Sequence, residues 1–172
     1  MYKRQLIEHR KALAVRANIL SKDHPDTAVS CSHIGNLLKE KGDLVGALVA
    51  YRQALAITVG LCGDDHPDSA TANLNIGRVL TAQDDFDEAR EAFQHGLTVR
   101  ETKLGREHVE TGRAYGYIGT FYSIQEEFGE AAEYQKKALT ILERKLGKKN
   151  RESIATRKRL NLAIKQTAEN DI

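Results

Sequence analysis

Apolar residues follow two helical patterns that alternate along the chain and are separated by short polar segments. In residues 107–147, for example, Tyr115, Ile118 and Tyr122 are spaced i, i+3, i+7, which places them on one side of a helix. A second helical run follows after two glutamates, so each pair of runs predicts an antiparallel helix hairpin. The complete pattern predicts helices over residues 6–20, 25–41, 43–61, 67–83, 85–103, 109–125, 127–146 and 151–168.

This two-helix pattern recurs with a step of 42 residues, seen most clearly in His24, His66 and His108. A fixed period of this length indicates stacked units that bury their apolar faces against their neighbours. The identical columns are Ile34/Ile76/Ile118, Gly35/Gly77/Gly119, Ala47/Ala89/Ala131, Leu55/Leu97/Leu139 and Gly63/Gly105/Gly147. The period divides the chain into repeats at 23–64, 65–106 and 107–148, after a second helix of an incomplete upstream unit at 1–22 and before a closing helix or half repeat at 149–172.

Small residues inside the predicted helices indicate close helix packing. Glycine in a helix interior costs about 1 kcal/mol relative to alanine, a cost that a close crossing explains. We expect the glycine column at 35, 77 and 119 to lie at such a crossing and to face the alanine column at 47, 89 and 131.

Gly96 departs from this logic because its column holds Ala54 and Ala138 in the other copies. Nothing in the neighbouring columns demands a missing β-carbon, so Gly96→Ala is predicted to stabilise the chain by about 0.5–1 kcal/mol. The alternative is that Gly96 makes room for a bulky residue of the next unit, such as Tyr115 or Tyr117.

The repeat resembles a known family. The resemblance rests on Ile34-Gly35, Leu38, Ala47, Tyr51 and Ala54 with their counterparts in the next two copies, a pattern similar to that of tetratricopeptide repeats. The eight extra residues per unit, with Leu-Gly followed by Asp-His-Pro-Asp, resemble the longer repeat of kinesin light chain and nephrocystin-type proteins. This resemblance implies an all-α, right-handed superhelical solenoid whose first helices line a concave groove for peptides or partner proteins.

First-helix residues that point away from the second helices are expected to line this groove. They are Ser32, Asn36, Lys39, Thr71, Leu74, Asn75, Arg78, Arg113, Tyr117 and Thr120. In the subset of the family that grips a C-terminal carboxylate, Asn36, Asn75 and Arg113 match the clamp positions. Ser32 and Tyr117 stand where that clamp has a lysine and an arginine, so the clamp's specificity does not transfer to this chain.

Composition narrows the class of partner. The 172 residues are 41% hydrophobic with a formal net charge of +2, too small to indicate nucleic acid or a membrane surface. No uninterrupted apolar run approaches 18 residues and nothing resembles a secretory signal, so a cytoplasmic protein with two reduced thiols, Cys31 and Cys62, is expected. Met1–Gln5 resembles the translated end of a sequencing adapter, so we interpret the chain as a fragment with further repeats expected at its ends. The helix predicted at 6–20 has no first helix, so either more repeats precede it or something else covers its apolar face.

The candidate chemistry is sparse. Histidines at equivalent positions of stacked helix pairs lie about 10 Å or more apart, whereas zinc requires ligands at about 2.1 Å, so we expect them to stabilise turns. No catalytic motif is present, which predicts neither an enzyme, a metal, a cofactor nor a small-molecule substrate. Nine basic residues between 143 and 165 suggest a solvated end or a face for the next unit rather than a binding site.

A non-catalytic scaffold for protein partners is therefore the leading hypothesis. The alternative is the repeat portion of a larger signalling NTPase that acts as its sensor or scaffold.

Overall fold

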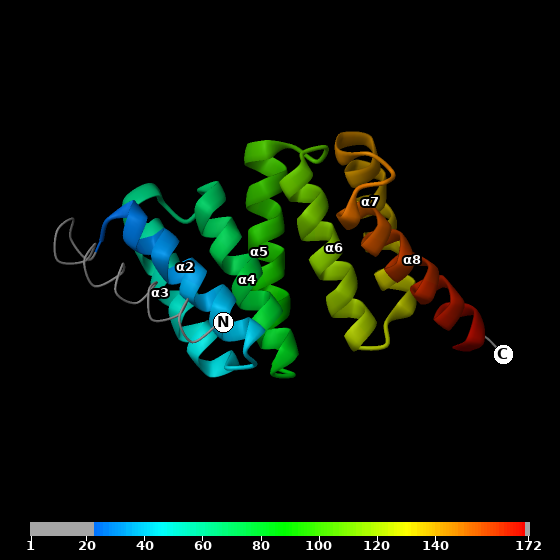
Figure 1. Ribbon diagram of the computed structural model, residues 1–172, viewed down its shortest axis with the longest axis horizontal. Coiled ribbons are helices and arrows are strands. Elements are labelled where there is room, and N and C mark those ends of the chain that lie inside the picture. The colour runs from blue at the N-terminus through cyan, green and yellow to red at the C-terminus, as the bar shows by residue number, and fades with distance from the viewer. Residues whose placement is uncertain (1–22, 171–172) are drawn as a thin grey trace. The chain divides into compact units, whose positions relative to one another are not determined.

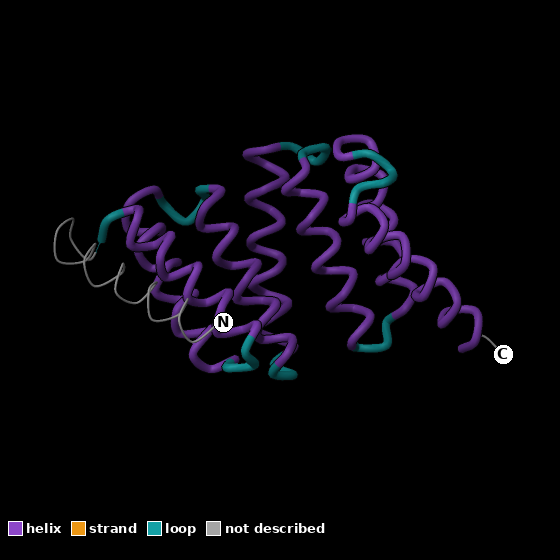
Figure 2. Tube along the Cα trace, viewed as in Figure 1, coloured by secondary structure: helices purple, strands orange, loops and turns teal. Residues whose placement is uncertain are grey.

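The computed structural model describes residues 23–170, which form seven α-helices (Figure 1). They are α2 (Pro25–Glu40), α3 (Leu44–Cys62), α4 (Pro67–Ala82), α5 (Phe86–Leu104), α6 (Val109–Ile124), α7 (Phe128–Leu146) and α8 (Arg151–Asn170). Each lies within two residues of its predicted position, and short loops join them (Figure 2). The helix expected at 6–20, the adapter-like Met1–Gln5 and the upstream half unit at 1–22 lie outside the described residues.

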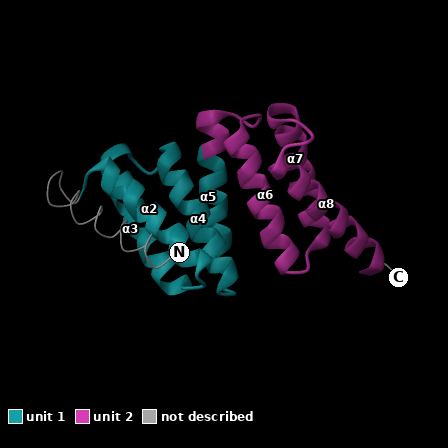
Figure 3. Cartoon of the chain, viewed as in Figure 1, with its two compact units in different colours: residues 1–99 teal, residues 100–172 magenta. Residues whose placement is uncertain are grey.

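The chain divides into two compact units, residues 1–99 and 100–172 (Figure 3). In the first unit α3 packs against both α2 and α4, and in the second α7 packs against both α6 and α8. The boundary between the units falls inside α5. Within residues 23–170 the fold is all-helical, as predicted, and is built from antiparallel helix pairs. The exact repeat boundaries and the right-handed superhelix remain predictions.

The three repeated histidines begin helices. Each is an N-cap with extended backbone, and its Nδ1 accepts a hydrogen bond of 3.2 Å from the N–H two residues later. An N-cap acceptor satisfies one of the free N–H groups at the start of a helix. The histidines therefore stabilise turns, as expected, and Asn150 replaces them at the start of α8, where its Oδ1 accepts from Glu152 N at 2.8 Å.

Each of the three 42-residue repeats has a glycine directly after its second helix. Gly63, Gly105 and Gly147 follow α3, α5 and α7 with φ values of 90°, 86° and 92°. At Gly63 and Gly147 ψ is 163° and 154°, an extended conformation open to glycine almost alone. The carbonyls of Gly63 and Gly105 then accept hydrogen bonds of 2.9 and 2.8 Å from the buried hydroxyls of Ser69 and Thr111.

In each of the three repeats, the turn between the two helices contains one residue with a positive φ. The column holds Gly42, Asp84 and Glu126, with φ values of 79°, 61° and 62°. A left-handed conformation costs a residue other than glycine about 1–2 kcal/mol, and asparagine or aspartate less than glutamate. Glutamate is therefore the least suited of the three.

Glu126→Gly is expected to stabilise the chain by about 0.5–1 kcal/mol, because relief of this strain exceeds the entropy that glycine adds to the unfolded state. Urea unfolding monitored by circular dichroism measures the change. The reverse substitution, Gly42→Glu, serves as the opposite control and is expected to destabilise by a similar amount.

The glycine column faces long side chains and not the alanine column. A β-carbon added at Gly35 would lie 2.8 Å from the ring of Tyr51, and one at Gly77 would lie 3.0 Å from the ring of Phe93. At Gly119 the neighbour is Gln135, at 2.8 Å. The close crossing was predicted correctly, but the expected glycine–alanine pairing was wrong, because a large side chain of the second helix lies flat on each glycine.

One helix in the described part of the chain, α3, is long and apolar enough by length and composition to cross a membrane. Packing explains only part of this apolar character, because Val45 and Val49 of the same helix are exposed. Ala47, Ala50, Tyr51, Ala54 and Ile57 are buried residues of this helix, which packs between α2 and α4.

Candidate functional site

The first helix of each pair carries the residues predicted to bind partners. We call the side of these helices that bears the predicted residues the first-helix face, and describe it for each unit separately. In the first unit α2 and α4 contribute to it, and in the second α6 and α8 do.

In the first unit the face contains an apolar slot of about 220 Å³ between α2, α3 and α4. The predicted residues Ser32 and Thr71 line it. Its apolar walls include Val29 and Leu61, whose side chains are 49% and 46% exposed. Exposed apolar side chains beside a cavity favour an apolar ligand group. Leu61 of the second helix was not predicted to take part.

Leu74 does not belong to this face. It is 1% exposed, and its Cγ lies 2.7 Å from the place of a β-carbon at Gly96 of α5. The prediction that it points away from the second helix is wrong. A leucine at this position fills the space that the glycine leaves, and burial of an apolar side chain there outweighs exposure to water.

Polar contacts orient the other predicted residues of the first unit. Asn36 Oδ1 accepts a hydrogen bond of 2.7 Å from the buried Tyr51, and Asn75 Oδ1 accepts one of 3.0 Å from Arg78 Nη1. Burial and the nearby charge of Arg78 lower the pKa of Lys39 from 10.5 to about 8. The face therefore holds two cations close to one another, an arrangement that an anionic ligand stabilises.

The lowered pKa of Lys39 predicts how the free energy of unfolding changes with pH. Its value of about 8 in the folded chain is lower than its unperturbed value of 10.5, so the unfolded chain binds more protons between these two pH values. The contribution of Lys39 to stability is therefore unfavourable below pH 8 and rises with pH up to about 10.5.

Lys39→Met is accordingly expected to raise the melting temperature relative to the unaltered chain at pH 7, with a difference that shrinks steadily towards pH 10. Melting curves of both proteins between pH 7 and pH 10 measure this difference. The other titrating groups are the same in both proteins, so their contributions to the melting temperature cancel. A difference that stays constant with pH would contradict the lowered pKa.

In the second unit the face contains a polar slot of about 450 Å³ between α6, α7 and α8. The predicted residues Arg113 and Tyr117 line it together with Arg151, Glu152 and Arg159. The predicted Thr120 lies one turn beyond Tyr117 and donates a hydrogen bond of 3.0 Å to the carbonyl of Gly116. The structure thus brings two of the three predicted residues of this unit to one slot.

Arg113 is already neutralised. Its Nε and Nη2 donate to the two carboxylate oxygens of Glu152 at 2.8 and 2.9 Å, and its Nη1 pairs with Glu110. These contacts raise the pKa of Arg113, chiefly through the hydrogen bond to Glu152, and the same bond lowers the pKa of Glu152. Arg113 therefore positions an acid and is not a free anion-binding group.

The free cations of this slot are Arg151 and Arg159. Both are exposed, and neither forms an ion pair with any residue of the described range 23–170. Sequence reasoning counted both in the basic end of the chain and set them aside as solvated. The signal that identifies Arg159 is the repeat itself, because it lies 42 residues after Tyr117, a predicted groove position.

The two slots are equivalent in the repeat. The residues Val29, Ser32 and His33 of the first lie two repeat steps before Arg113, Gly116 and Tyr117 of the second. Both slots are formed by two successive first helices and the second helix between them. The geometry therefore recurs while the lining changes from apolar to charged.

Residues 23–170 contain no group of three or more His, Cys, Asp or Glu side chains placed to hold a metal ion.

Known proteins share this pattern and fold. A family model described as a tetratricopeptide repeat matches residues 30–102 and 68–144, and no family with a catalytic activity was found. No curated protein sequence matches the chain.

Among solved structures, BtubC (BKLC) from P. vanneervenii is 20% identical, with a TM-score of 0.82 over 97% of this chain and 66% of that one. The chain therefore spans just under two thirds of that relative. A putative kinesin light chain from Podospora anserina, with nearly identical TPR-like repeats, is 18% identical, with a TM-score of 0.76 over 99% of this chain and 81% of that one. At these identities the likeness concerns the fold.

Proposed function

The chain belongs to the tetratricopeptide repeat family, and we propose that it is a scaffold that binds protein segments on its first-helix faces. Tetratricopeptide repeat domains are typically protein-interaction modules and are generally non-catalytic. The finer part of the proposal is a scaffold role like that of a kinesin light chain, the description given to the Podospora anserina neighbour.

We propose that the slot of the second unit binds an acidic segment of the partner. The observation that carries this is the pair Arg151 and Arg159, which line one slot and have no acidic partner in residues 23–170. A guanidinium binds a carboxylate through two parallel hydrogen bonds, which adds geometric selectivity to charge attraction. Glu152 is held by Arg113 and so does not compete for these two arginines.

The slot of the first unit supports a different preference. Its lining is mostly apolar, with Val29, Ala28 and Leu61 beside Ser32, and about 220 Å³ accommodates one apolar side chain of moderate size. We propose that it accepts an apolar residue of a bound segment.

The direct experiment uses fluorescein-labelled hexaglutamate as the probe and fluorescence anisotropy as the measurement. The double variant R151E/R159E is expected to weaken binding by about tenfold or more, because both direct cations become repulsive. The matched control is K145E/K149E, which changes the net charge equally but alters residues that do not line the slot. This control is expected to change affinity by less than about threefold at 150 mM salt, where distant charges are screened.

Equal losses in the two double variants would show that the probe responds to net charge alone, and the slot assignment would be wrong. A loss confined to R151E/R159E supports it. Repeating the titration with hexaglutamine tests whether the acidic groups are required.

A further inference from the structure

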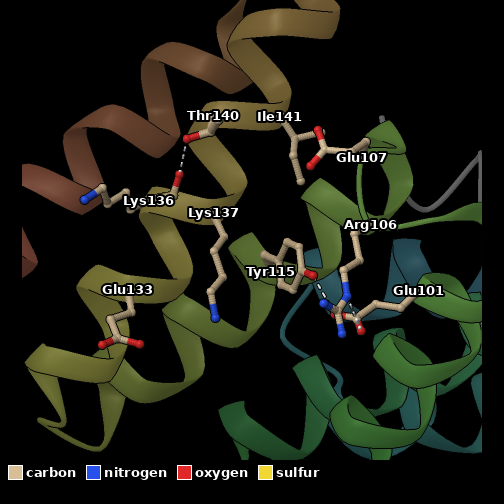
Figure 4. Close-up of a pocket in the computed structure, with 9 residues that line it drawn as sticks. All are labelled: Glu101, Arg106, Glu107, Tyr115, Glu133, Lys136, Lys137, Thr140 and Ile141. Atoms are coloured by element: carbon tan, nitrogen blue, oxygen red, sulfur yellow. Dashed lines mark hydrogen bonds and ion pairs between the residues drawn. The ribbon is translucent and has the colours of Figure 1, made fainter.

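The second unit also contains a pocket on the opposite side of α6 from the slot between α6, α7 and α8. Residues two apart in a helix point about 200° apart, and here Tyr115 lines the pocket while Tyr117 lines the slot. The pocket has a volume of about 660 Å³ and lies between the α5–α6 turn, α6 and α7 (Figure 4). Its lining residues are Glu101, Arg106, Glu107, Tyr115, Glu133, Lys136, Lys137, Thr140 and Ile141.

Internal contacts occupy most of its acids. Glu101 accepts hydrogen bonds from Tyr115 Oη at 2.5 Å and from Arg106 Nε at 3.3 Å, and Glu107 pairs with Arg144. Burial and Glu101 raise the pKa of Tyr115, so its hydroxyl remains a donor.

The basic side chains are arranged differently. Lys137 Nζ lies 4.9 Å from the centre of the Tyr134 ring and forms no ion pair with any described residue. Figure 4 shows Lys137 and Arg106 on two sides of Tyr115, whereas Lys136 points away. Arg106 is 78% exposed and contacts Glu101 through its Nε, which leaves its two terminal nitrogens facing solvent for a ligand.

The equivalent position in the preceding repeat contains a carboxylate. The residues 42 positions before Arg106, Tyr115 and Lys137 are Asp64, Asn73 and His95. There His95 bridges the turn and the first helix, with Nε2 at 2.9 Å from an Asp64 carboxylate oxygen and Nδ1 at 3.0 Å from Asn73 Nδ2. One carboxylate thus completes a chain of polar contacts. In the next repeat arginine replaces that carboxylate and lysine replaces the histidine. Arg106 contacts Glu101, whereas Lys137 has no acidic partner in residues 23–170.

We propose that this pocket binds a carboxylate from a partner protein, which lies between Arg106 and Lys137 and supplies the acid that Asp64 provides in the preceding repeat. A carboxylate accepts charge-assisted hydrogen bonds from both side chains at once. The Tyr115 ring forms the apolar floor of the pocket, and its buried position excludes a stacking ligand. This site is separate from the slot that contains Arg151 and Arg159, so the chain contacts partners on two sides of α6.

The test uses amide chemical shifts of the ¹⁵N-labelled chain during titration with acetyl-Gly-Glu-Glu-Gly-amide. Saturable shifts are expected at residues 106, 115 and 137, and the glutamine version of the peptide is expected to produce none. The variant R106D/Y115N/K137H installs the residues of the preceding repeat and is expected to weaken binding at least tenfold. The control K148D/K149H makes the same change in net charge away from the pocket and is expected to retain binding.

Several results overturn the proposal. One is unchanged binding by the triple variant, and another is equal binding of the glutamine peptide. Stronger shifts with inorganic phosphate than with the peptide would replace the carboxylate by a phosphate group. Loss of the shifts in R151E/R159E would place the probe in the α6–α8 slot, in which case this proposal fails while the proposed function stands. Because the triple variant alters three positions, K137Q serves as the single substitution that decides the outcome if the triple variant does not fold.

Discussion

Glu110→Ala is expected to lower the free energy of unfolding by about 3 kcal/mol, because it removes the acid beside a buried cation. Arg100 of α5 is only 4% exposed, and its Nη2 lies 3.3 Å from a carboxylate oxygen of Glu110. Its Nη1 also donates to the Glu110 carbonyl at 2.5 Å. Burial lowers the pKa of Arg100, and the Glu110 carboxylate opposes that change, so this acid stabilises the buried charge.

The contribution of the Arg100–Glu110 pair can be isolated by repeating Glu110→Ala in a chain that lacks Arg100. The column of Arg100 holds Thr58 and Leu142 in the other repeats, so Arg100→Leu is a substitution that the same fold already accommodates. In the Arg100→Leu chain, Glu110→Ala is expected to cost about 1 kcal/mol, mainly through its lost contact with Arg113. Urea unfolding of the four proteins gives the coupling energy of the pair. A coupling near zero would show that the buried guanidinium does not depend on this acid.

Gly96→Ala is expected to destabilise the chain by about 1–3 kcal/mol, the range for an overpacked contact. The added β-carbon would lie 2.7 Å from Leu74 Cγ and 3.0 Å from the backbone oxygen of Ala70. The stabilisation expected from the sequence is thus reversed. The alternative of a steric requirement is correct in kind, but the bulky neighbour is Leu74 and neither tyrosine.

Gly96 differs from the alanines of its column because the residue that it contacts in the first helix, Leu74, is larger than its counterparts in the other repeats. Leu74 is in the column of Ser32 and Gly116, and where that column holds a small residue the partner column holds Ala54 or Ala138. At Gly116 an added β-carbon would lie 3.7 Å from the β-carbon of Ala138, an ordinary contact.

Leu74→Ala should therefore rescue the substitution. In that background Gly96→Ala is expected to be neutral or slightly stabilising, because the helix gains alanine and the clash with Leu74 is gone. Equilibrium urea unfolding of the four chains measures this. If Gly96→Ala costs the same in both backgrounds, the contact with the Ala70 carbonyl is responsible.

These pairs show how far the sequence could predict the fold. The helices and their ends follow from local rules: the apolar period, the histidine caps and the glycine ends act within a few residues. The partners of Gly35 and Gly96 could not be predicted in this way, because they depend on the crossing geometry of two helices. A column whose residues vary, such as Ser32, Leu74 and Gly116, signals a contact only when its partner column is compared at the same time.

The candidate site was predicted in the same uneven manner. Periodicity placed Arg113 and Tyr117 on the same side of α6, and both line one slot, since side-chain direction along a helix follows from position. It could not show that Arg113 is held by Glu152 of α8, which lies 39 residues further along the chain. Charge state at a surface depends on such long-range pairs, so the repeat could indicate the position of Arg159 in the groove, whereas the absence of an acidic partner for Arg151 and Arg159 within residues 23–170 required the structure.

The recurrence of one slot with two linings has a consequence for engineering. The buried columns recur in both slots, whereas the lining differs: Val29 is exposed in one, and its counterpart Arg113 is half-buried and paired with Glu152 in the other. The lining of one slot is therefore transferable to the other, by two repeat steps, only together with the residues that pair with it, such as Glu110 and Glu152 for Arg113. In a repeat array of this kind the period itself gives the positions at which a lining residue and its partner are to be exchanged together.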